Sequence, residues 1–348
     1  MLRLTRSSAA YRRISSKNDK MTTVVTAAEI KNPHFDDGLL IWQDEYSGRY
    51  LPPAADYADQ FDLQWRLCLE GAEGFAGAAD ASIDDAAIAD RIFEWTGQDH
   101  DRAGSSRAHR DVRPLDHPLD VSLIRNKECI DIGCGLGRWT RAMQELGARS
   151  VLSVDISKSA LAGVRRFNPE VLQADVTELA SQHPELINRF DLANLWGVAM
   201  CTHDPLQTFL SAAATVKPGG ALYLMVYAPE GMHGTTITNL RRKHFFQLDS
   251  VAEKLAYVDQ VYHRRWDVFS PFRENFKNLL RNAMRRPKGS KIGVLDMLEP
   301  FYNWVIPLDV IDGWMQKAGF GDVCLLNEHE PRKCAYHVLG TKSGTAQA

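Results

Sequence analysis

The chain has 348 residues, with 41 lysines and arginines against 44 aspartates and glutamates, and a net charge of -3. Hydrophobic residues make up 45%, enough for one large globular domain with additions. No apolar run is long enough to span a membrane, and the overall charge does not indicate nucleic-acid binding. The six cysteines show no Cys-x-x-Cys spacing, which favours buried free thiols over disulfides or a metal site.

The segment from Met1 to Lys20 differs in composition from the rest. It is rich in arginine and serine, its first acid is Asp19, and it has no central apolar block. This composition fits an organellar transit peptide. We then expect a mature chain that starts near Met21 in a mitochondrion or plastid. The alternatives are a disordered basic tail or an extension upstream of a start at Met21, either of which leaves a cytoplasmic protein.

Residues 21–118 are predicted to form a helical N-terminal region. Tyr57, Phe61 and Trp65 recur at i, i+4 and i+8, which places them on one face of a helix. That face either packs against the core or covers a ligand as a lid. A second helix is expected over Ser82–Trp95, because Ser82 can cap its start, and a polar connection follows it.

A glycine-rich turn follows the first buried strand of the predicted core. The apolar run that begins at Glu128 leads to Asp131, and glycines then fall at alternate positions: Gly133, Gly135 and Gly137. A helix is predicted from Arg138 to about Leu146. Glycine permits positive φ and a close approach of backbone to a ligand, and a helix start presents unpaired N–H groups.

Four further apolar runs continue the pattern of a parallel α/β sheet. The second ends at Asp155, about 20 residues after the glycine turn, where a carboxylate can accept both hydroxyls of a ribose. The alternative is that Asp155 only caps the helix near Ser157. The third run leads to Asp175 and Val176, the fourth covers Phe190–Gly197, and the fifth covers Ala221–Tyr227 after Lys217-Pro218-Gly219-Gly220.

Two of these motifs together resemble class I S-adenosylmethionine-dependent methyltransferases of the small-molecule type. They are Asp131-x-Gly133-x-Gly135-x-Gly137 and Lys217-Pro218-Gly219-Gly220. The resemblance implies an α/β fold with a Rossmann-like seven-stranded sheet and helices on both faces. It also implies S-adenosyl-L-methionine as cofactor. The positions that would bind the cofactor are Asp131, Gly133, Gly135, Gly137, Asp155, Ile156, Asp175, Val176 and Trp196.

The S-adenosylmethionine-binding core is expected over residues 119–227, followed by a helical insertion over 228–306. Helices are predicted at 238–246, 250–267 and 271–284. The insertion is basic, which indicates either solvated helix faces or arginines that hold an anionic substrate. Its basic residues include Arg241, Arg242, Lys243, Arg264, Arg265, Arg281, Arg285, Arg286 and Lys288. Residues 307–348 complete the core with a helix over 308–318 and strands over 323–326 and 335–341.

Methyl transfer from a sulfonium is an in-line displacement, so the protein mainly positions a nucleophile and excludes water. The candidate catalytic residues are His203, Trp196 and Tyr227. His203 follows the fourth strand and is the candidate base for an oxygen or nitrogen acceptor. A thioether acceptor needs no base, and aromatic side chains would then face the cationic transition state. Cys201 is expected to line the site.

We therefore expect a methyltransferase that acts on a small, anionic acceptor, with no metal and no nucleic-acid partner. The chain is similar in size and core to the methylthiohydroxybutyrate S-methyltransferases of dimethylsulfoniopropionate synthesis. One alternative is an O- or N-methyltransferase of another small metabolite, with His203 as base; a second is a cofactor-binding protein without catalysis. The glycine spacing disfavours a nicotinamide-dependent oxidoreductase. The oligomeric state stays open, with a homodimer as one option.

Overall fold

The computed structural model describes residues 25–26, 40–41, 58–70, 115–116, 119–229, 236–263, 268–269, 272–273, 275–276, 291–300, 302–330 and 333–344. Several predictions fall outside them: the transit peptide Met1–Lys20, the helix Ser82–Trp95, most of the connection after it, and Tyr57. The same holds for most of the helix expected over 271–284 and for the basic residues between 264 and 267 and between 277 and 290.

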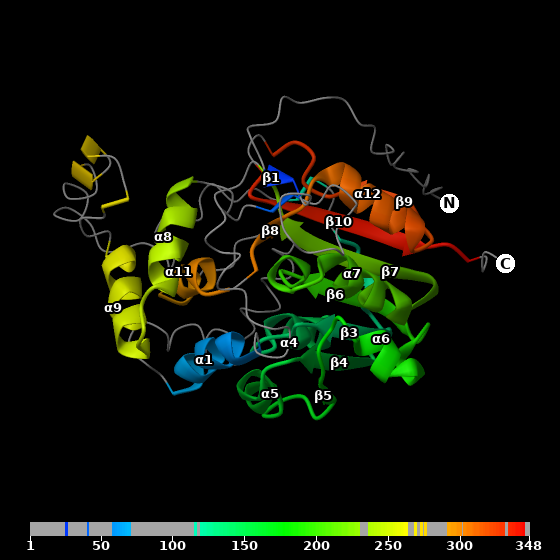
Figure 1. The fold of residues 1–348 in the computed structure, drawn as a ribbon. Coiled ribbons are helices and arrows are strands. Elements are labelled where there is room, and N and C mark those ends of the chain that lie inside the picture. The colour runs from blue at the N-terminus through cyan, green and yellow to red at the C-terminus, as the bar shows by residue number, and fades with distance from the viewer. Residues whose placement is uncertain are drawn as a thin grey trace, which may run out of the picture.

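A seven-stranded sheet forms the centre of the molecule, with the strand order β5-β4-β3-β6-β7-β10-β9 (Figure 1). The first five strands of this order are parallel, and β10 runs antiparallel to both β7 and β9. The strands are β3 (Glu128–Ile132), β4 (Ser150–Asp155), β5 (Val171–Gln173), β6 (Phe190–Trp196), β7 (Val216–Tyr227), β9 (Phe320–Leu325) and β10 (Ala335–Lys342). The predicted Rossmann-like, seven-stranded fold class is confirmed.

Helices cover both faces of this sheet. On one face, α4 contributes Trp139 and Met143 to a buried cluster that also contains Val151 of β4. On the other face, α7 and α12 contribute Phe209 and Trp314 to the largest cluster. The helices of the core are α4 (Arg138–Glu145), α5 (Lys158–Val164), α6 (Leu179–Gln182), α7 (Pro205–Thr215) and α12 (Leu308–Lys317), with short 3-10 turns η4 (Val121–Leu123), η5 (Pro184–Leu186) and η6 (Ala199–Cys201). Two covered faces explain why the central strands are apolar throughout.

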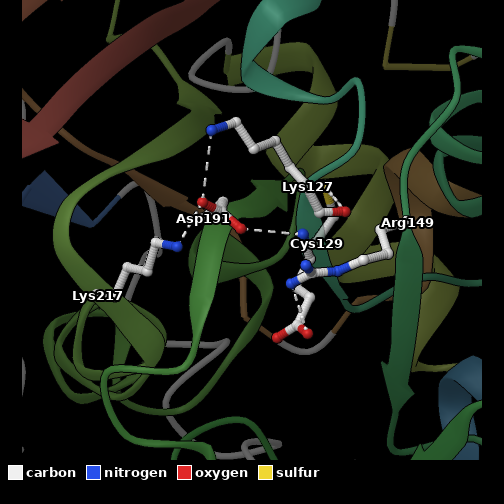
Figure 2. A network of polar contacts seen from close by, with 6 residues as sticks. Lys127, Cys129, Arg149, Asp191 and Lys217 are labelled. Atoms are coloured by element: carbon white, nitrogen blue, oxygen red, sulfur yellow. Dashed lines mark hydrogen bonds and ion pairs between the residues drawn. The ribbon is translucent and has the colours of Figure 1, made fainter.

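A network of charged side chains joins strands at the amino edge of the sheet (Figure 2). Asp191 is the second residue of β6. Its Oδ1 lies 2.6 Å from Lys217 Nζ and 3.8 Å from Lys127 Nζ. Its Oδ2 accepts a hydrogen bond of 3.0 Å from the backbone N–H of Glu128. Arg149 in turn lies 2.7 Å from the carboxylate of Glu128. These contacts fix the starts of β3, β6 and β7 relative to one another.

Three helices of the chain between β7 and β8 stand to one side of the sheet, where α11 also contacts α1 (Figure 1). They are α8 (Thr236–Phe246), α9 (Val251–Tyr262) and α11 (Lys291–Leu298), and α1 covers Ala58–Leu69. One apolar cluster joins the four helices and includes Leu67, Leu136, Phe245, Val258 and Leu295. Leu136 belongs to the glycine turn, so this cluster reaches the edge of the core.

The predicted insertion helices differ from the observed ones in extent. The helix α9 begins close to the expected start, where Ser250 and Glu253 form a capping box, but it ends at Tyr262 and not at Asp267. His263 closes it with a backbone hydrogen bond to Asp259 O. The helix α11 was not predicted, nor was the small antiparallel sheet of β1 (Val25–Thr26), β2 (Leu40–Ile41) and β8 (Trp304–Val305).

The strand β7 begins earlier than the sequence predicted. Lys217-Pro218-Gly219-Gly220 lies inside Val216–Tyr227 and not before it. Val216 pairs with Phe190 of β6, and the register then shifts before Leu192 pairs with Ala221. Gly219, with φ of 77°, allows this irregularity to be absorbed within the strand. At the other end of the sheet, β9 covers Phe320–Leu325, three residues earlier at its start than expected.

Candidate functional site

The three glycines after β3 all adopt positive φ, at 69°, 54° and 83° for Gly133, Gly135 and Gly137. A Cβ at Gly133 would lie 2.2 Å from Cγ2 of Val198, which follows β6. Gly137 is the N-cap of α4, so the first turn of that helix lies at the carboxyl edge of the sheet. The turn therefore presents bare backbone, as the sequence predicted, and a side chain at Gly133 would force Val198 to move.

Asp155 lies at the carboxyl end of β4, beside this turn. Its Oδ2 accepts a hydrogen bond of 2.8 Å from Gly135 N, and its Oδ1 accepts one of 2.9 Å from Ser157 N. The side chain is 7% exposed. Burial raises the pKa of Asp155 to about 6, although the two backbone hydrogen bonds favour the ionised form. The N-cap of α5 is Ser157, and the backbone N–H of Ser157 donates to Asp155, so Asp155 supports the helix start without being its cap residue.

Asp131 lies deeper, beneath the turn. It is 1% exposed and accepts hydrogen bonds of 2.7 Å from Thr140 Oγ1 and 2.8 Å from Asn194 Nδ2. These bonds tie β3 to α4 and to β6. Burial raises the pKa of Asp131, and the two hydrogen bonds oppose that rise. Contact of Asp131 with a cofactor stays a prediction; in the structure it braces the turn from below.

The helix α1 lies across the glycine turn. Cζ2 of Trp65 would be only 2.9 Å from a Cβ at Gly135. Asp62 Oδ1 accepts hydrogen bonds of 2.9 Å from Ser157 Oγ and 3.0 Å from Ser159 N, at the start of α5. Burial raises the pKa of Asp62, but these hydrogen bonds outweigh it and the net pKa is lowered. The helix α1 therefore packs against the core at the glycine turn, and its role as a lid over a ligand stays a prediction.

Trp196, the last residue of β6, lies on the opposite side of the turn from Asp155. Its ring centroid is 5.3 Å from that of Trp139. The guanidinium carbon of Arg138 lies 5.0 Å from the Trp196 ring centroid and 4.9 Å from that of Trp139. Below this group, Tyr223 Oη is 2.7 Å from Nδ1 of His337. Burial lowers the pKa of His337 to about 3, so this histidine stays neutral.

The loop after β6 carries the predicted base. The His203 ring lies 6.4 Å from the ring of Tyr302, between centroids, and Tyr302 stacks with Trp304. Trp304 Nε1 donates a hydrogen bond of 2.8 Å to Thr202 O, which fixes the loop against β8. Tyr227, at the end of β7, is 9% exposed, and burial raises its pKa. The structure thus brings His203 and Tyr302 close together.

The insertion contributes two charged residues close to this loop. Arg242 of α8 is 4% exposed and donates hydrogen bonds to Met297 O and Pro300 O, at the end of α11. Burial lowers the pKa of Arg242 to about 10, and the nearby side chains of Cys201, Tyr227 and Asp296 oppose that change.

Asp296 of α11 interacts with the side chain of Gln64 from α1 and feels the positive charges of Arg138 and Arg242. Burial raises the pKa of Asp296, and these contacts oppose the rise. Charged groups from α4, α8 and α11 therefore meet at the carboxyl edge of the sheet.

The remaining predicted residues lie on the β4–β5 side. Asp175 Oδ1 accepts hydrogen bonds of 2.9 and 2.8 Å from Thr177 N and Oγ1, and Val176 is buried beside it. Ile156 O accepts a hydrogen bond of 3.1 Å from Gln173 Nε2. On the other side, burial raises the pKa of Cys201, which keeps it a thiol and suits a lining role.

The sequence analysis assigned no role to Arg138, Gln64 or Asp296. Arg138 could have been noticed, because it directly follows the third glycine and is the first residue of α4. Gln64 and Asp296 are brought to the edge only by the packing of α1 against α11. Among the described residues, no helix is long and apolar enough to cross a membrane, and no cluster of His, Cys, Asp and Glu could hold a metal ion.

A family model described as a methyltransferase domain matches residues 106–325, more than half of the chain. The chain belongs to the class I S-adenosylmethionine-dependent methyltransferases. Its cofactor is S-adenosylmethionine, as the resemblance implied.

Curated relatives match over a shorter length. A tRNA U34 carboxymethyltransferase of Pseudomonas aeruginosa is 29% identical over 117 residues, 33% of this chain and 36% of that protein. A ubiquinone biosynthesis O-methyltransferase of Saccharophagus degradans is 26% identical over 131 residues, 35% of this chain and 54% of that protein. The chain thus spans between about a third and a half of these relatives.

Among solved structures, an S-adenosylmethionine-dependent methyltransferase from Mesorhizobium loti aligns with a TM-score of 0.38 at 17% identity. The alignment covers 63% of this chain and 92% of that one.

Proposed function

We propose that this methyltransferase transfers a methyl group to a small acceptor that carries a negative charge. The observation that carries the proposal is Arg242, a cation that is 4% exposed and lies where the insertion meets the ends of β6 and β7. A buried charge is costly unless an opposite charge compensates it. Arg242 and Arg138 both act on the buried carboxylate of Asp296, and Arg138 also acts on that of Asp131. A guanidinium at this place could bind an acceptor carboxylate in a bidentate manner.

The cofactor residues follow from the geometry of the carboxyl edge. Asp155 would accept the ribose hydroxyls, because its oxygens lie at the end of β4 with only neutral N–H partners. Gly133 and Gly135 would let the cofactor approach the backbone. Asp175 and Val176 lie on the β5 side, where an adenine ring would follow the ribose. Trp196 lies on the β6 side, nearer the methyl group.

The finer proposal is S-methylation of a thioether acid such as methylthiohydroxybutyrate. A thioether attacks with its own lone pair, so no proton is removed. The side chains of Trp196, Tyr227 and Tyr302 would face the sulfonium charge, which aromatic faces stabilise. Arg242 would bind the acceptor carboxylate in a bidentate manner and fix the sulfur relative to the methyl carbon.

The second candidate is O- or N-methylation with His203 as base. It is supported by the position of His203 in the loop after β6, beside Tyr302, and by the O-methyltransferase among the relatives. In this reaction His203 would take a proton from a hydroxyl or amine as the acceptor attacks. A third candidate, a cofactor-binding protein without turnover, predicts binding of S-adenosylmethionine with no methyl transfer to any acceptor.

The experiment is a transfer assay with methyl-labelled S-adenosylmethionine and a panel of acceptors. The panel contains methylthiohydroxybutyrate, its methyl ester, hydroxy acids, phenols and unfractionated tRNA. We expect label in the thioether acid and a loss of about 10- to 100-fold for its ester, because the ester lacks the charge that Arg242 would bind. Label in tRNA or a phenol alone would overturn the proposal.

Variants of two neighbouring arginines separate binding of the acceptor from general damage. Arg242→Met should raise KM for the thioether acid at least tenfold, and Arg242→Lys should raise it less. Arg241→Met changes the adjacent residue of α8 and should leave KM unchanged. His203→Ala should lower turnover by less than about tenfold for a thioether. A loss of about 10²–10⁴ together with the disappearance of a basic limb in the pH–rate profile would favour the O- or N-methylation candidate.

A further inference from the structure

A row of hydrogen-bonded side chains crosses three neighbouring strands of the sheet, β6, β7 and β10 (Figure 1). Trp196 of β6 pairs with Met225 of β7, and Met225 pairs with His337 of β10, so Trp196 and His337 lie at the same level of the sheet. Tyr223 lies between them on β7, two residues before Met225, and its hydroxyl contacts both side chains. We call Trp196, Tyr223 and His337 the polar row.

The direction of each hydrogen bond in the polar row follows from the chemistry of the three groups. Tryptophan offers only a donor, its indole Nε1–H, and this group bonds to the Tyr223 hydroxyl. The hydroxyl oxygen therefore accepts from Trp196, and its own hydrogen is left for Nδ1 of His337, 2.7 Å away. Burial lowers the pKa of His337 to about 3, so its ring is neutral and Nδ1 can accept.

Trp196 is the member of the polar row that reaches the candidate site. Tyr223 is 1% exposed and His337 is 4% exposed, whereas Trp196 is only partly buried. Its ring packs against Arg138 and Trp139, which limits its tilt. The χ2 torsion of an aromatic side chain is broad and roughly two-fold, so packing against the ring face alone allows the indole to turn over. A hydrogen bond at Nε1 selects one of these orientations.

Filling the core does not require a polar pair at Tyr223 and His337. Tyr223 belongs to an apolar cluster that also contains Val151, Leu192 and Ala221. Burial of a hydroxyl and an imidazole costs free energy, and apolar side chains of the same shape can replace a hydrogen-bonded pair at little cost in stability. The contact with Trp196 gives the pair a purpose that apolar side chains could not serve.

We infer that Tyr223 and His337 are positioning residues for methyl transfer, which hold the indole of Trp196 in one orientation at the carboxyl edge. The inference rests on the proposed place of Trp196 near the methyl group. His337 takes the hydrogen of the Tyr223 hydroxyl and so leaves an oxygen lone pair for the indole N–H. An indole that could turn over would vary in its distance from the sulfonium. The competing account is that the pair only stabilises the sheet.

The first experiment observes the indole N–H of Trp196 in the full-length protein without any acceptor. In protein labelled with 15N at tryptophan, the Nε1–H resonance that is absent from Trp196→Phe belongs to Trp196. Tyr223→Phe should shift this resonance and raise its hydrogen-exchange rate at least about tenfold, because its acceptor is gone. His337→Leu should have a smaller effect, and His337→Asn the smallest, because an amide oxygen can still accept the tyrosine hydrogen. An unchanged resonance and exchange rate in Tyr223→Phe would overturn the inference.

The second experiment measures coupling in turnover, with methyl-labelled S-adenosylmethionine and methylthiohydroxybutyrate. Tyr223→Phe and Trp196→Phe should each lower kcat by about 3- to 30-fold and change KM by less than about threefold. The double variant should be no slower than Trp196→Phe alone, because Tyr223 acts only through Trp196. If the wild type does not methylate this acid, the proposed acceptor is wrong, whereas the resonance of Trp196 still tests the positioning.

Tyr257→Phe is the matched control. Tyr257 of α9 is also a buried tyrosine beside a histidine, with its ring centroid 4.8 Å from that of His244. Its loss should leave kcat and the Trp196 resonance unchanged. If Trp196→Phe leaves kcat unchanged, the proposed role of Trp196 is wrong and the inference fails with it. If Trp196→Phe lowers kcat but the effects of Tyr223→Phe and Trp196→Phe multiply in the double variant, or if Tyr257→Phe is as slow as Tyr223→Phe, the pair is structural and only the inference is wrong.

Discussion

The two edges of the central sheet hold their carboxylates in opposite ways. At the amino edge, Asp191 lies between the ammonium groups of Lys127 and Lys217, and these lysine side chains are 44% and 42% exposed (Figure 2). At the carboxyl edge, Asp131 and Asp155 are buried, and the hydrogen bonds that they accept come from neutral groups. One edge neutralises its acids with exposed cations, and the other buries them with uncharged donors.

The pKa values of Asp191 and Asp155 are shifted in opposite directions, in agreement with this difference in surroundings. Burial raises the pKa of Asp191, but the hydrogen bond and charge of Lys217 outweigh it, and the net pKa is lowered. At Asp155 burial dominates, and the pKa is raised to about 6. A protein that only needed stability would not bury carboxylates this way, because a buried charge with neutral partners is costly. We therefore expect the carboxyl edge to bind a ligand that supplies hydroxyl donors and positive charge, as S-adenosylmethionine does.

The largest expected effect comes from filling the glycine turn. Gly133→Ala would place a Cβ 2.2 Å from Val198 at a φ of 69°, whereas Gly219→Ala, in β7 near the amino edge, would meet no atom within 4 Å at a φ of 77°. Both substitutions strain the backbone by about 1–2 kcal/mol, and only Gly133 adds overpacking of about 1–3 kcal/mol. Denaturant unfolding should therefore show a loss of about 2–5 kcal/mol for Gly133→Ala and about 1–2 kcal/mol for Gly219→Ala.

The affinity for the cofactor product gives a second comparison of the variants Gly133→Ala and Gly219→Ala. Gly133→Ala should abolish binding of S-adenosylhomocysteine in calorimetry, because Val198 and the turn must move apart to accommodate the new methyl group. Gly219→Ala should bind the ligand like the wild type. Equal losses of stability in the two variants would mean that the collision at Gly133 relaxes freely, and the turn would then not be specified by its contact with Val198.

The local parts of this fold could be predicted from the sequence, and the parts made by long-range packing could not. The run from Glu128 to Gly137 carries its own signals, because strand periodicity and glycine conformation are local. The contact between Trp65 and Gly135 depends on where α1 docks, and no local pattern encodes it. The helix α11 contains Gly293 and lacks a clear polar face, and β8 has two residues, too short for an alternating pattern. The positions of Arg242 and Asp296 could be found only in the folded chain.

The second prediction exchanges a carboxylate for an amide at each edge. Asp155→Asn should weaken S-adenosylhomocysteine binding by about 1–3 kcal/mol, because an amide oxygen is a poorer acceptor for ribose hydroxyls and the amide nitrogen faces a backbone N–H. Asp191→Asn, the matched change at the amino edge, should leave the affinity unchanged. Calorimetry on both variants measures the difference. A loss of similar size at Asp191 would show that the edges are not functionally separate.

The third prediction uses the opposite pKa shifts of the two edges. Since the pKa of Asp155 is raised to about 6, its contribution to stability without ligand is fully present below the unfolded pKa of 3.8 and is lost as pH rises through about 6. Asp191, with a lowered pKa, contributes above 3.8 and loses its contribution as pH falls through its folded pKa.

In the proposed site the ribose hydroxyls bind the ionised form of Asp155, so the affinity for S-adenosylhomocysteine should fall about tenfold between pH 7 and pH 5. Calorimetry as a function of pH measures this fall, and Asp155→Asn should flatten the profile. A wild-type affinity that stays constant over this range would show that the ribose hydroxyls are not bound by a carboxylate that titrates near 6.

The smallest effect is expected from the ion pairs at the amino edge. Lys217→Met removes the closest cation from Asp191, but the lysine is 42% exposed and Lys127 remains at 3.8 Å. Exposed ion pairs contribute about 0–1 kcal/mol, so unfolding free energy should fall by no more than that, and less in high salt. Cofactor affinity should not change. A loss above about 2 kcal/mol, or weaker binding of S-adenosylhomocysteine, would mean that the start of β7 transmits strain along the strand to Tyr227. The amino edge would then help to set the geometry of the acceptor site as well as the register of the sheet.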